Sequence, residues 1–249
     1  MSFTDEQLER YARHIVLKEI GGDGQRKLGE ATVAVIGAGG IGSPVIQYLT
    51  AAGIGKIILV DDDEVALSNL QRQTIYAIED IGKPKVEAAQ IAATSINTDT
   101  DFILYKERIA AHNALDMISS ATVVIDGSDN FDTRLAVADA AQQMHIPLIS
   151  AAVDQFEGQL AVYRGWEADK PCYRCLVGND PGRPDMSCAD RGVLGPLTGV
   201  LGSLAALEAL RAITRFGQDP SGKLLLFDAL GFRFRTVTVP KDHACRCAQ

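Results

Sequence analysis

The chain has 249 residues, of which 47% are hydrophobic and 22% charged, an ordinary globular composition with enough apolar side chains for a sizeable core. Its formal net charge of −8, together with the lack of a long lysine or arginine block, argues against nucleic-acid binding. No apolar run reaches the roughly 18 residues that a membrane span needs. The N-terminus has no apolar signal core, so we expect a cytoplasmic protein without a membrane partner. The 5 cysteines favour metal binding or catalysis over a disulfide framework.

The chain begins with a predicted helix. Thr4 and Gln7 form a capping box, and apolar residues then recur at helical spacing as far as Val16. We expect a glycine-rich connection over residues 21–24, followed by a short helical piece that leads into the first strand.

Strands and helices then alternate. We expect strands at residues 32–36, 56–60, 102–105, 122–125 and 147–151, and helices at residues 41–52, 86–96, 113–119 and 133–144. This alternation predicts an α/β fold with a doubly wound, mostly parallel sheet. The pattern changes after about Val153. We expect a strand at 158–163, an irregular stretch at 164–192, a long apolar helix at 195–216 and closing strands at 223–227 and 232–239.

A glycine-rich turn follows the first strand. Gly37, Gly39 and Gly42 have the G-x-G-x-x-G spacing, with Gly40 between them. In a strand–turn–helix context this spacing predicts a nucleotide phosphate at the helix N-terminus. Asp61 ends the second strand, where an acidic side chain usually binds a ribose hydroxyl. These residues suit a dinucleotide dehydrogenase and an ATP-using enzyme equally well.

Charged residues farther along the chain favour ATP. Arg72 and Lys85 would neutralise a triphosphate more naturally than a redox cofactor, although each could also be a solvated loop charge. Asp129 follows the fourth strand and so lies at the sheet edge where ligands bind, as a Mg²⁺ ligand or an acid–base group. Asp126 and Asn130 are alternatives as helix caps.

Two cysteine pairs suggest a metal site. Cys172 and Cys175 form a C-x-x-C motif, and Cys245 and Cys247 form a tighter C-x-C motif near the C-terminus. Together they would make a tetrahedral, structural Cys₄ zinc site, in which His243 is an alternative ligand. A redox pair or plain buried thiols are the other interpretations.

In combination, the motifs resemble the ThiF/MoeB/HesA family, bacterial relatives of the ubiquitin-activating enzymes. The motifs that carry this resemblance are Arg10-Tyr-Ala-Arg13-His-Ile, Gly37-Ala-Gly-Gly-Ile-Gly42, Ser68-Asn-Leu-Gln-Arg-Gln73, Gly82-Lys-Pro-Lys85, Asp129-Asn130, Cys172-Tyr-Arg-Cys175 and the C-terminal cysteines. The resemblance implies one Rossmann-like adenylation domain whose sheet is extended by antiparallel C-terminal strands. Its parts would be a helical arm (1–30), a nucleotide-binding core (31–152) and a carrier-binding, zinc-knuckle part (153–249).

The resemblance also implies a reaction. The C-terminal Gly-Gly carboxylate of a small ubiquitin-like sulfur carrier attacks the α-phosphorus of MgATP, giving an acyl-adenylate and pyrophosphate, for molybdenum cofactor or thiamine biosynthesis. By this analogy Asp129 holds Mg²⁺, Asp61 binds ribose, the Gly37, Gly39, Gly40 and Gly42 turn supports the nucleotide, and Asn69, Arg72 and Lys85 contact the phosphates. Arg13 would reach the γ-phosphate from the second subunit of a homodimer.

The resemblance leaves three matters open. The family usually has C-x-x-C where this chain has Cys245-Arg-Cys247, which weakens the zinc prediction. Cys188 matches a loop cysteine that links covalently to the carrier in some members, and it is otherwise a simple loop thiol. Without a sulfurtransferase extension, sulfur would come from a separate donor protein. The competing hypotheses are an NAD-dependent oxidoreductase and a non-catalytic carrier-binding scaffold.

Overall fold

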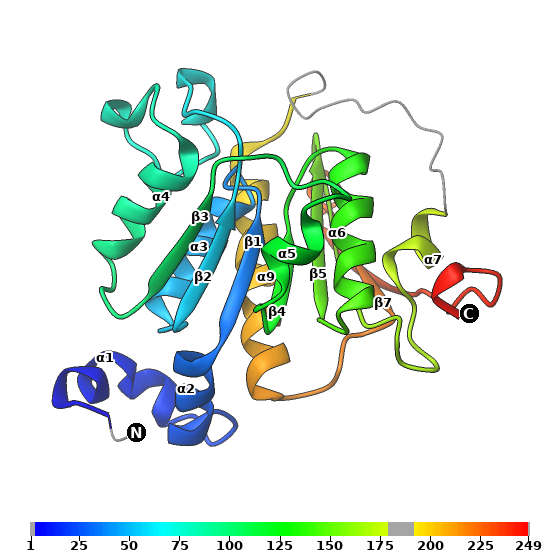
Figure 1. The fold of residues 1–249 in the computed structure, drawn as a ribbon, viewed down its shortest axis with the longest axis horizontal. Helices are drawn as coiled ribbons and strands as arrows, with labels where there is room; N and C mark the ends of the chain where they lie inside the picture. The colour runs from blue at the N-terminus through cyan, green and yellow to red at the C-terminus, as the bar shows by residue number, and fades with distance from the viewer. Residues whose placement is uncertain (1–2, 179–191, 249) are drawn as a thin grey trace.

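The computed structural model describes residues 3–178 and 192–248, which build an eight-stranded sheet in the order β3-β2-β1-β4-β5-β6-β7-β8 (Figure 1). The strands are β1 (Thr32–Ile36), β2 (Lys56–Val60), β3 (Asp101–Tyr105), β4 (Val123–Asp126), β5 (Leu148–Asp154), β6 (Glu157–Tyr163), β7 (Lys223–Asp228) and β8 (Arg233–Thr238). Pairs from β3 to β5 are parallel, and β5 to β8 pair antiparallel. The predicted fold class is therefore confirmed.

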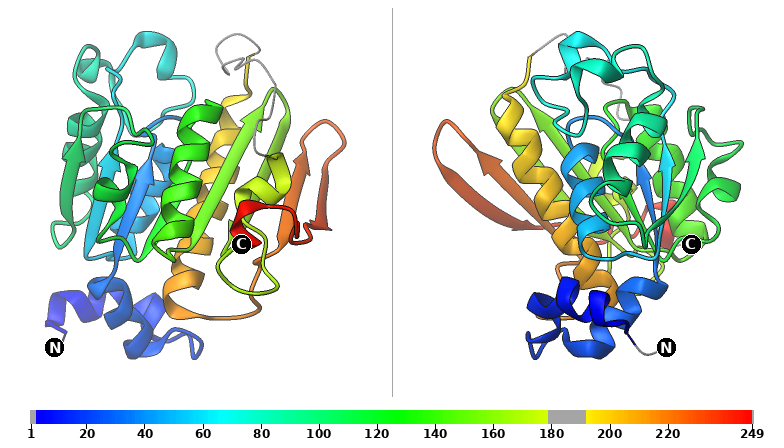
Figure 2. Two further views of the ribbon diagram at one scale, coloured as in Figure 1. Left: turned by 45° about the vertical axis from the view of Figure 1, so that its right-hand side comes forward. Right: turned by 90° about the vertical axis from the view of Figure 1, so that its left-hand side faces the viewer.

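Helices cover both faces of the sheet. They are α1 (Asp5–Ile15), α2 (Gly21–Glu30), α3 (Gly42–Ala51), α4 (Lys85–Thr94), α5 (Ala114–Ile118), α6 (Phe131–Gln143), α7 (Tyr173–Val177) and α9 (Gly195–Thr214), with short 3-10 turns η1 (Leu67–Asn69), η2 (Ile78–Asp80) and η3 (Arg246–Ala248). Helices α3, α4 and α9 pack on one face, and α5 and α6 pack on the other (Figures 1 and 2).

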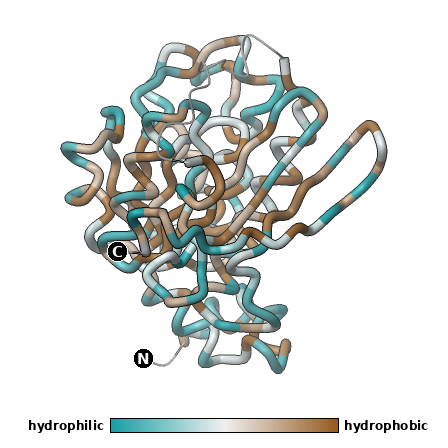
Figure 3. The backbone as a smooth tube through the Cα atoms, turned by 90° about the vertical axis from the view of Figure 1, so that its right-hand side faces the viewer, coloured by the Kyte–Doolittle hydropathy of each residue, from teal (hydrophilic) through white to brown (hydrophobic). Residues whose placement is uncertain are grey.

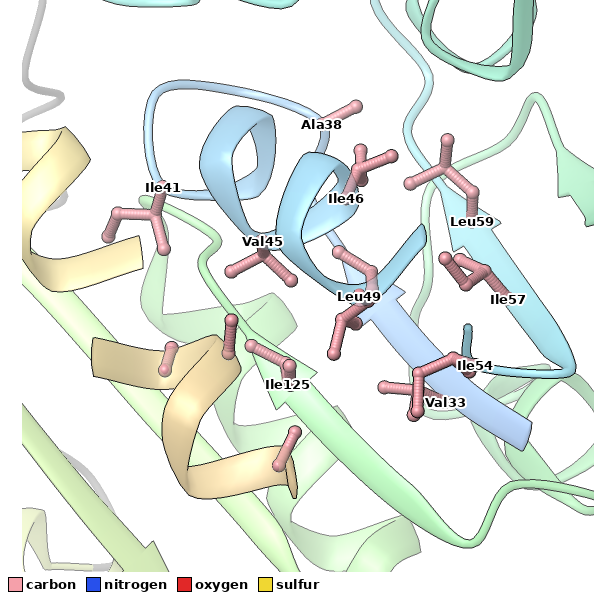
Figure 4. Packing of buried hydrophobic residues seen from close by; sticks show 14 of the residues in the cluster. Val33, Ala38, Ile41, Val45, Ile46, Leu49, Ile54, Ile57, Leu59 and Ile125 are labelled. Carbon is pink, nitrogen blue, oxygen red and sulfur yellow. The ribbon is translucent and has the colours of Figure 1, made fainter. Parts of the chain in front are cut away.

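The central strands are largely apolar because both of their faces are buried. Along β1, Val33 and Val35 belong to the core cluster under α3 and α9, whereas Ala34 and Ile36 belong to the cluster under α5 and α6. Figure 4 shows the first cluster, in which Leu49 of α3 lies over the strands. A doubly covered sheet of this kind fixes the carboxyl ends of β1, β2 and β4 at one edge.

The N-terminal arm lies at the opposite edge, where the parallel strands begin (Figure 1). The expected glycine-rich connection at residues 21–24 is wrong, because helix α2 already begins at Gly21. The buried side chain of Gln25 anchors this helix, since its amide donates to the Ala52 carbonyl oxygen at 2.9 Å and its oxygen lies 3.0 Å from Nδ1 of His14.

The C-terminal part contains one helix that the sequence did not predict. The stretch predicted to be irregular contains the short helix α7. By length and composition α9 is apolar enough to span a membrane, yet it packs in the core against α3 and the sheet. The β7–β8 hairpin projects from the body of the molecule (Figures 2 and 3) and exposes Leu230, Phe232 and Phe234.

Candidate active site

A cavity of about 310 Å³ lies at the carboxyl ends of β1, β2 and β4. Eight of the predicted site residues line it: Gly37, Gly39, Gly40, Asp61, Asn69, Arg72, Lys85 and Asp129. These side chains and glycines come from five separate segments of the chain, so the topology of the sheet brings them together.

The glycine turn closes the base of this cavity. Gly37 adopts φ = +90°, which side chains rarely permit. A Cβ atom on Gly42 would lie 2.0 Å from the carbonyl oxygen of Gly37, so only glycine fits at the start of α3. The turn thus folds tightly enough to direct the N-terminus of α3 toward the cavity, as the glycine spacing predicts.

Asp61 ends β2 beside the glycine turn. Its carboxylate accepts the backbone N–H of Ala38 at 2.7 Å and that of Asp63 at 2.9 Å. Burial raises the pKa of Asp61, and the charge of Lys85 opposes this shift. Asp61 therefore stabilises the turn itself through its two backbone hydrogen bonds.

Two of the predicted cationic residues, Arg72 and Lys85, line the cavity. The ammonium of buried Lys85, at the start of α4, donates to Oδ2 of Asp63 at 2.7 Å. Arg72 donates to the Ser68 carbonyl oxygen at 3.0 Å, and Asn69 accepts the Ala66 N–H at 3.0 Å. Both fold the polar segment after β2 against the cavity.

Asp129 lies in the turn between β4 and α6, with its side chain exposed at the cavity. Asn130, not Asp126, caps α6, because its side chain accepts the Thr133 N–H at 2.9 Å. Buried Asp126 instead accepts the N–H and hydroxyl of Ser128. The turn is therefore ordered around a carboxylate that is available to a cation.

Arg13, like Gly42, is a predicted residue that does not line the cavity. It is exposed on α1, at the opposite edge of the sheet, and does not line the cavity (Figure 1).

Sequence reasoning assigned no role to several polar residues that also line the cavity, among them Gln73, Arg108 and Arg134. Gln73 is buried, and its Oε1 atom has no hydrogen-bond partner among the described residues. Arg108 pairs with Asp62 at 3.3 Å, and Arg134 binds the turn that holds Asp129. Gln73 and Arg134 lie inside segments already singled out, at Ser68–Gln73 and just after Asp129-Asn130, whereas no motif marked Arg108.

The four predicted cysteines of the two pairs form one cluster. Their sulfur atoms all lie within 4.8 Å of one another. Cys172 Sγ is 3.8 Å from Cys175 Sγ and 3.6 Å from Cys245 Sγ, and Cys175 Sγ is 3.6 Å from Cys247 Sγ. A tetrahedral zinc ion with bonds of about 2.3 Å separates its sulfur ligands by about 3.8 Å, so the cluster has the dimensions for zinc.

The remaining cysteine and histidine candidates have different outcomes. His243 is exposed and is not a member of the cluster, so the C-x-C pair completes the set without it. Cys188 lies outside the described residues. Burial raises the pKa of the Cys172 thiol, which a bound cation would counter.

Comparison with known proteins identifies relatives along the whole chain. The ThiF family model matches residues 11–247. A sulfur carrier protein adenylyltransferase from Thermus thermophilus is 43% identical, with 98% of this chain and 92% of the relative covered. A sulfur carrier protein ThiS adenylyltransferase from Escherichia coli is 39% identical, with coverages of 97% and 95%. Among solved structures, E. coli MccB has a TM-score of 0.83 at 22% identity, covering 98% of this chain and 73% of that chain.

Proposed function

This chain belongs to the ThiF family, and we propose that it uses ATP to adenylate the C-terminal carboxylate of a small sulfur-carrier protein. Relatives named adenylyltransferases at 39% and 43% identity support this proposal. The observation that carries it is the convergence of Arg72, Lys85 and Asp129 around the glycine turn, since a dinucleotide needs no such set of charges.

In the proposed reaction a carboxylate oxygen of the carrier bonds to the α-phosphorus of ATP. The bond between that phosphorus and the bridging oxygen breaks, and pyrophosphate leaves with the electron pair. Negative charge develops on the departing group, and Arg72 and Lys85 would stabilise it. Asn69 would orient the phosphates and Asp61 the ribose. No protein nucleophile is required for this step, so Cys188 is dispensable for it.

Mg²⁺ would neutralise the phosphates, and Asp129 is our candidate ligand. Its carboxylate is exposed at the cavity, and oxygen ligands of this kind suit Mg²⁺. Zn²⁺ would be held by Cys172, Cys175, Cys245 and Cys247 in a closed, structural site.

A second cavity suggests where the carrier approaches. It has a volume of about 570 Å³ and lies over β5 to β8, lined by apolar Phe227 and charged Arg233 and Arg235 among others. Val153 lines both cavities, so the two are adjacent. We infer that the carrier docks on this C-terminal part and extends its Gly-Gly tail past Val153.

The position of Arg13 suggests a homodimer. Because Arg13 is remote from the cavity of its own chain, it can serve the γ-phosphate only from a partner subunit. We further expect a cytoplasmic location and a pathway leading to molybdenum cofactor or thiamine.

Exchange of labelled pyrophosphate into ATP tests the proposed reaction. We expect exchange that requires both Mg²⁺ and a carrier ending in Gly-Gly. The matched control is the same carrier with a C-terminal carboxamide, which has no carboxylate to react. NADH binding without carrier-dependent exchange would instead support an oxidoreductase.

A further inference from the structure

Side chains fix both neighbours of Asp129. Nε of Arg134 donates to the Ser128 carbonyl oxygen at 3.0 Å, and its Nη2 donates to the same oxygen. On the other side, Asn130 caps α6. The peptide bond that enters Asp129 is therefore held by a charged donor, while the carboxylate itself stays exposed.

The same turn is held from below by a buried acid. Oδ1 of Asp126 accepts the Ser128 N–H at 2.9 Å and the Ser128 hydroxyl at 2.6 Å. Burial raises the pKa of Asp126, and the positive charge of Arg134 opposes that shift. Arg134 thus compensates the acid that binds one side of Ser128 and itself binds the other side.

Arg134 also connects this turn to the cysteine cluster. Its guanidinium lies beside the hydroxyl of Tyr173, the residue that follows Cys172. The ring of Tyr173 packs edge-on against Tyr163, with centroids 5.7 Å apart. A change in the position of the cluster would therefore reach Arg134 through one side chain.

A second contact joins the cluster to the same helix. The carboxylate of Asp139 in α6 accepts hydrogen bonds from Nε of Arg174 at 2.7 Å and from its Nη2 at 2.8 Å. It also forms an ion pair with Arg246. Arg174 lies between the two cysteines of the C-x-x-C motif, and Arg246 lies between the two cysteines of the C-x-C motif. Helix α6 is therefore held to the cluster at Asp139 and to the Asp129 turn at Arg134.

We propose that Arg134 is a positioning residue that holds the Ser128–Asp129 peptide for magnesium-nucleotide binding and, through Tyr173, couples this turn to the four-cysteine cluster. The inference rests on the proposed function only in assigning Mg²⁺ to Asp129. Arg134 orders the backbone that presents the ligand, and a metal held by the four cysteines would fix Tyr173 and so Arg134.

The test measures ATP affinity by calorimetry with Mg²⁺ and in magnesium-free buffer. Mg²⁺ raises the affinity of the parent for ATP by a certain factor, and we expect this factor to be about tenfold smaller in Arg134→Gln. The reason is the loss of charged hydrogen bonds at the turn. Affinity in magnesium-free buffer should stay near that of the parent, which a general loss of structure would not produce. Arg211→Gln is the matched control. Arg211 lies in the last turn of α9 and, like Arg134, donates to a backbone carbonyl oxygen, that of Phe216.

Tyr173→Phe tests the coupling and remains informative if Arg134→Gln does not fold. Removing the cluster metal with a zinc chelator should weaken MgATP binding by the parent roughly fivefold, within the usual range for coupled sites. In Tyr173→Phe the same treatment should change the affinity less. Parent-like magnesium dependence in Arg134→Gln, or equal effects of the chelator on the parent and Tyr173→Phe, overturns the proposal. If the parent shows no pyrophosphate exchange, but its ATP affinity depends on Mg²⁺ and on Arg134 as expected, only the proposed reaction is contradicted.

Discussion

The Nζ atom of Lys85 lies 2.7 Å from Oδ2 of Asp63, inside the wall of the candidate active site. An antiparallel bridge between Glu64 and Pro84 and the hydrogen bond from the Lys85 N–H to the Asp63 carbonyl oxygen hold the two backbones together. Lys85 is buried, whereas Asp63 is largely exposed. A phosphate that binds Lys85 therefore has to compete with, or share, this carboxylate.

The first prediction concerns this pair. Asp63→Asn should bind MgATP about threefold to tenfold more tightly, because it removes a negative charge from the phosphate side of Lys85. Calorimetric titration measures the affinity. Asp62→Asn is the control, since Asp62 pairs with Arg108 instead. Equal gains in the two variants would mean that only the overall charge of the cavity matters.

The second prediction concerns Asp129. Asp129→Asn should lower the rate of pyrophosphate exchange by about 100-fold to 1,000-fold, because a group that stabilises developing charge is lost. Asp132→Asn changes a similarly exposed carboxyl in the first turn of α6 and should keep the parental rate. An Asp129→Ala protein that supports carrier function as well as the parent would favour the non-catalytic scaffold.

The third prediction concerns metal. The parent should contain about one zinc ion per chain by elemental analysis, as a closed Cys₄ site requires. Cys245→Ser should lose it, and with it about 4 kcal/mol of the free energy of unfolding at free metal about 1,000 times the dissociation constant. Cys188→Ala should retain the metal. A metal-free parent of unchanged stability in urea would refute the zinc assignment.

The fourth prediction concerns the pH dependence of stability. Because burial raises the folded-state pKa of Asp61 above its unfolded value, the folded state binds that proton more tightly. The associated stability is present below the unfolded pKa and is lost as pH rises through the folded pKa. The free energy of unfolding of Asp61→Asn, relative to the parent, should therefore rise with pH across this window and then level off. Urea titrations at several pH values measure it, and a difference that does not vary with pH would contradict it.

The fifth prediction concerns Arg13. Arg13→Ala and Asp129→Ala should each be inactive in pyrophosphate exchange, whereas a mixture that exchanges subunits should regain roughly a quarter of the parental activity. Random pairing makes half of the dimers mixed, and each mixed dimer has one intact site. A mixture as inactive as its components would place Arg13 outside the reaction.

The sequence was sufficient to predict much of the fold. The parallel strands are short apolar runs between turn residues, so the ends of β1 to β4 were predicted to within one residue, whereas β5 continues to Asp154, three residues past its expected end. The family resemblance was also confirmed. Helix α2 was partly missed because glycines at its start have poor helix propensity, and the tertiary contacts of Gln25 outweigh that propensity.

The site was predictable where one local motif specifies one environment. The glycine turn and the cysteine pairs belong to this class, and the structure brings both sets together. The roles of those residues remain predictions. The Lys85–Asp63 pair and the contacts of Arg134 depend on how distant segments cross, so spacing along the chain could not reveal them.

The close approach of Gly42 to the Gly37 carbonyl has a consequence for variation of this protein. With only 2.0 Å available to a Cβ atom, no mutation at position 42 can add a side chain without moving the backbone. A substitution at position 42 therefore cannot change the nucleotide preference while the turn keeps its shape. Such a change has to arise from other residues that line the cavity, such as exposed Arg108, whose exchange leaves the strand, turn and helix in place.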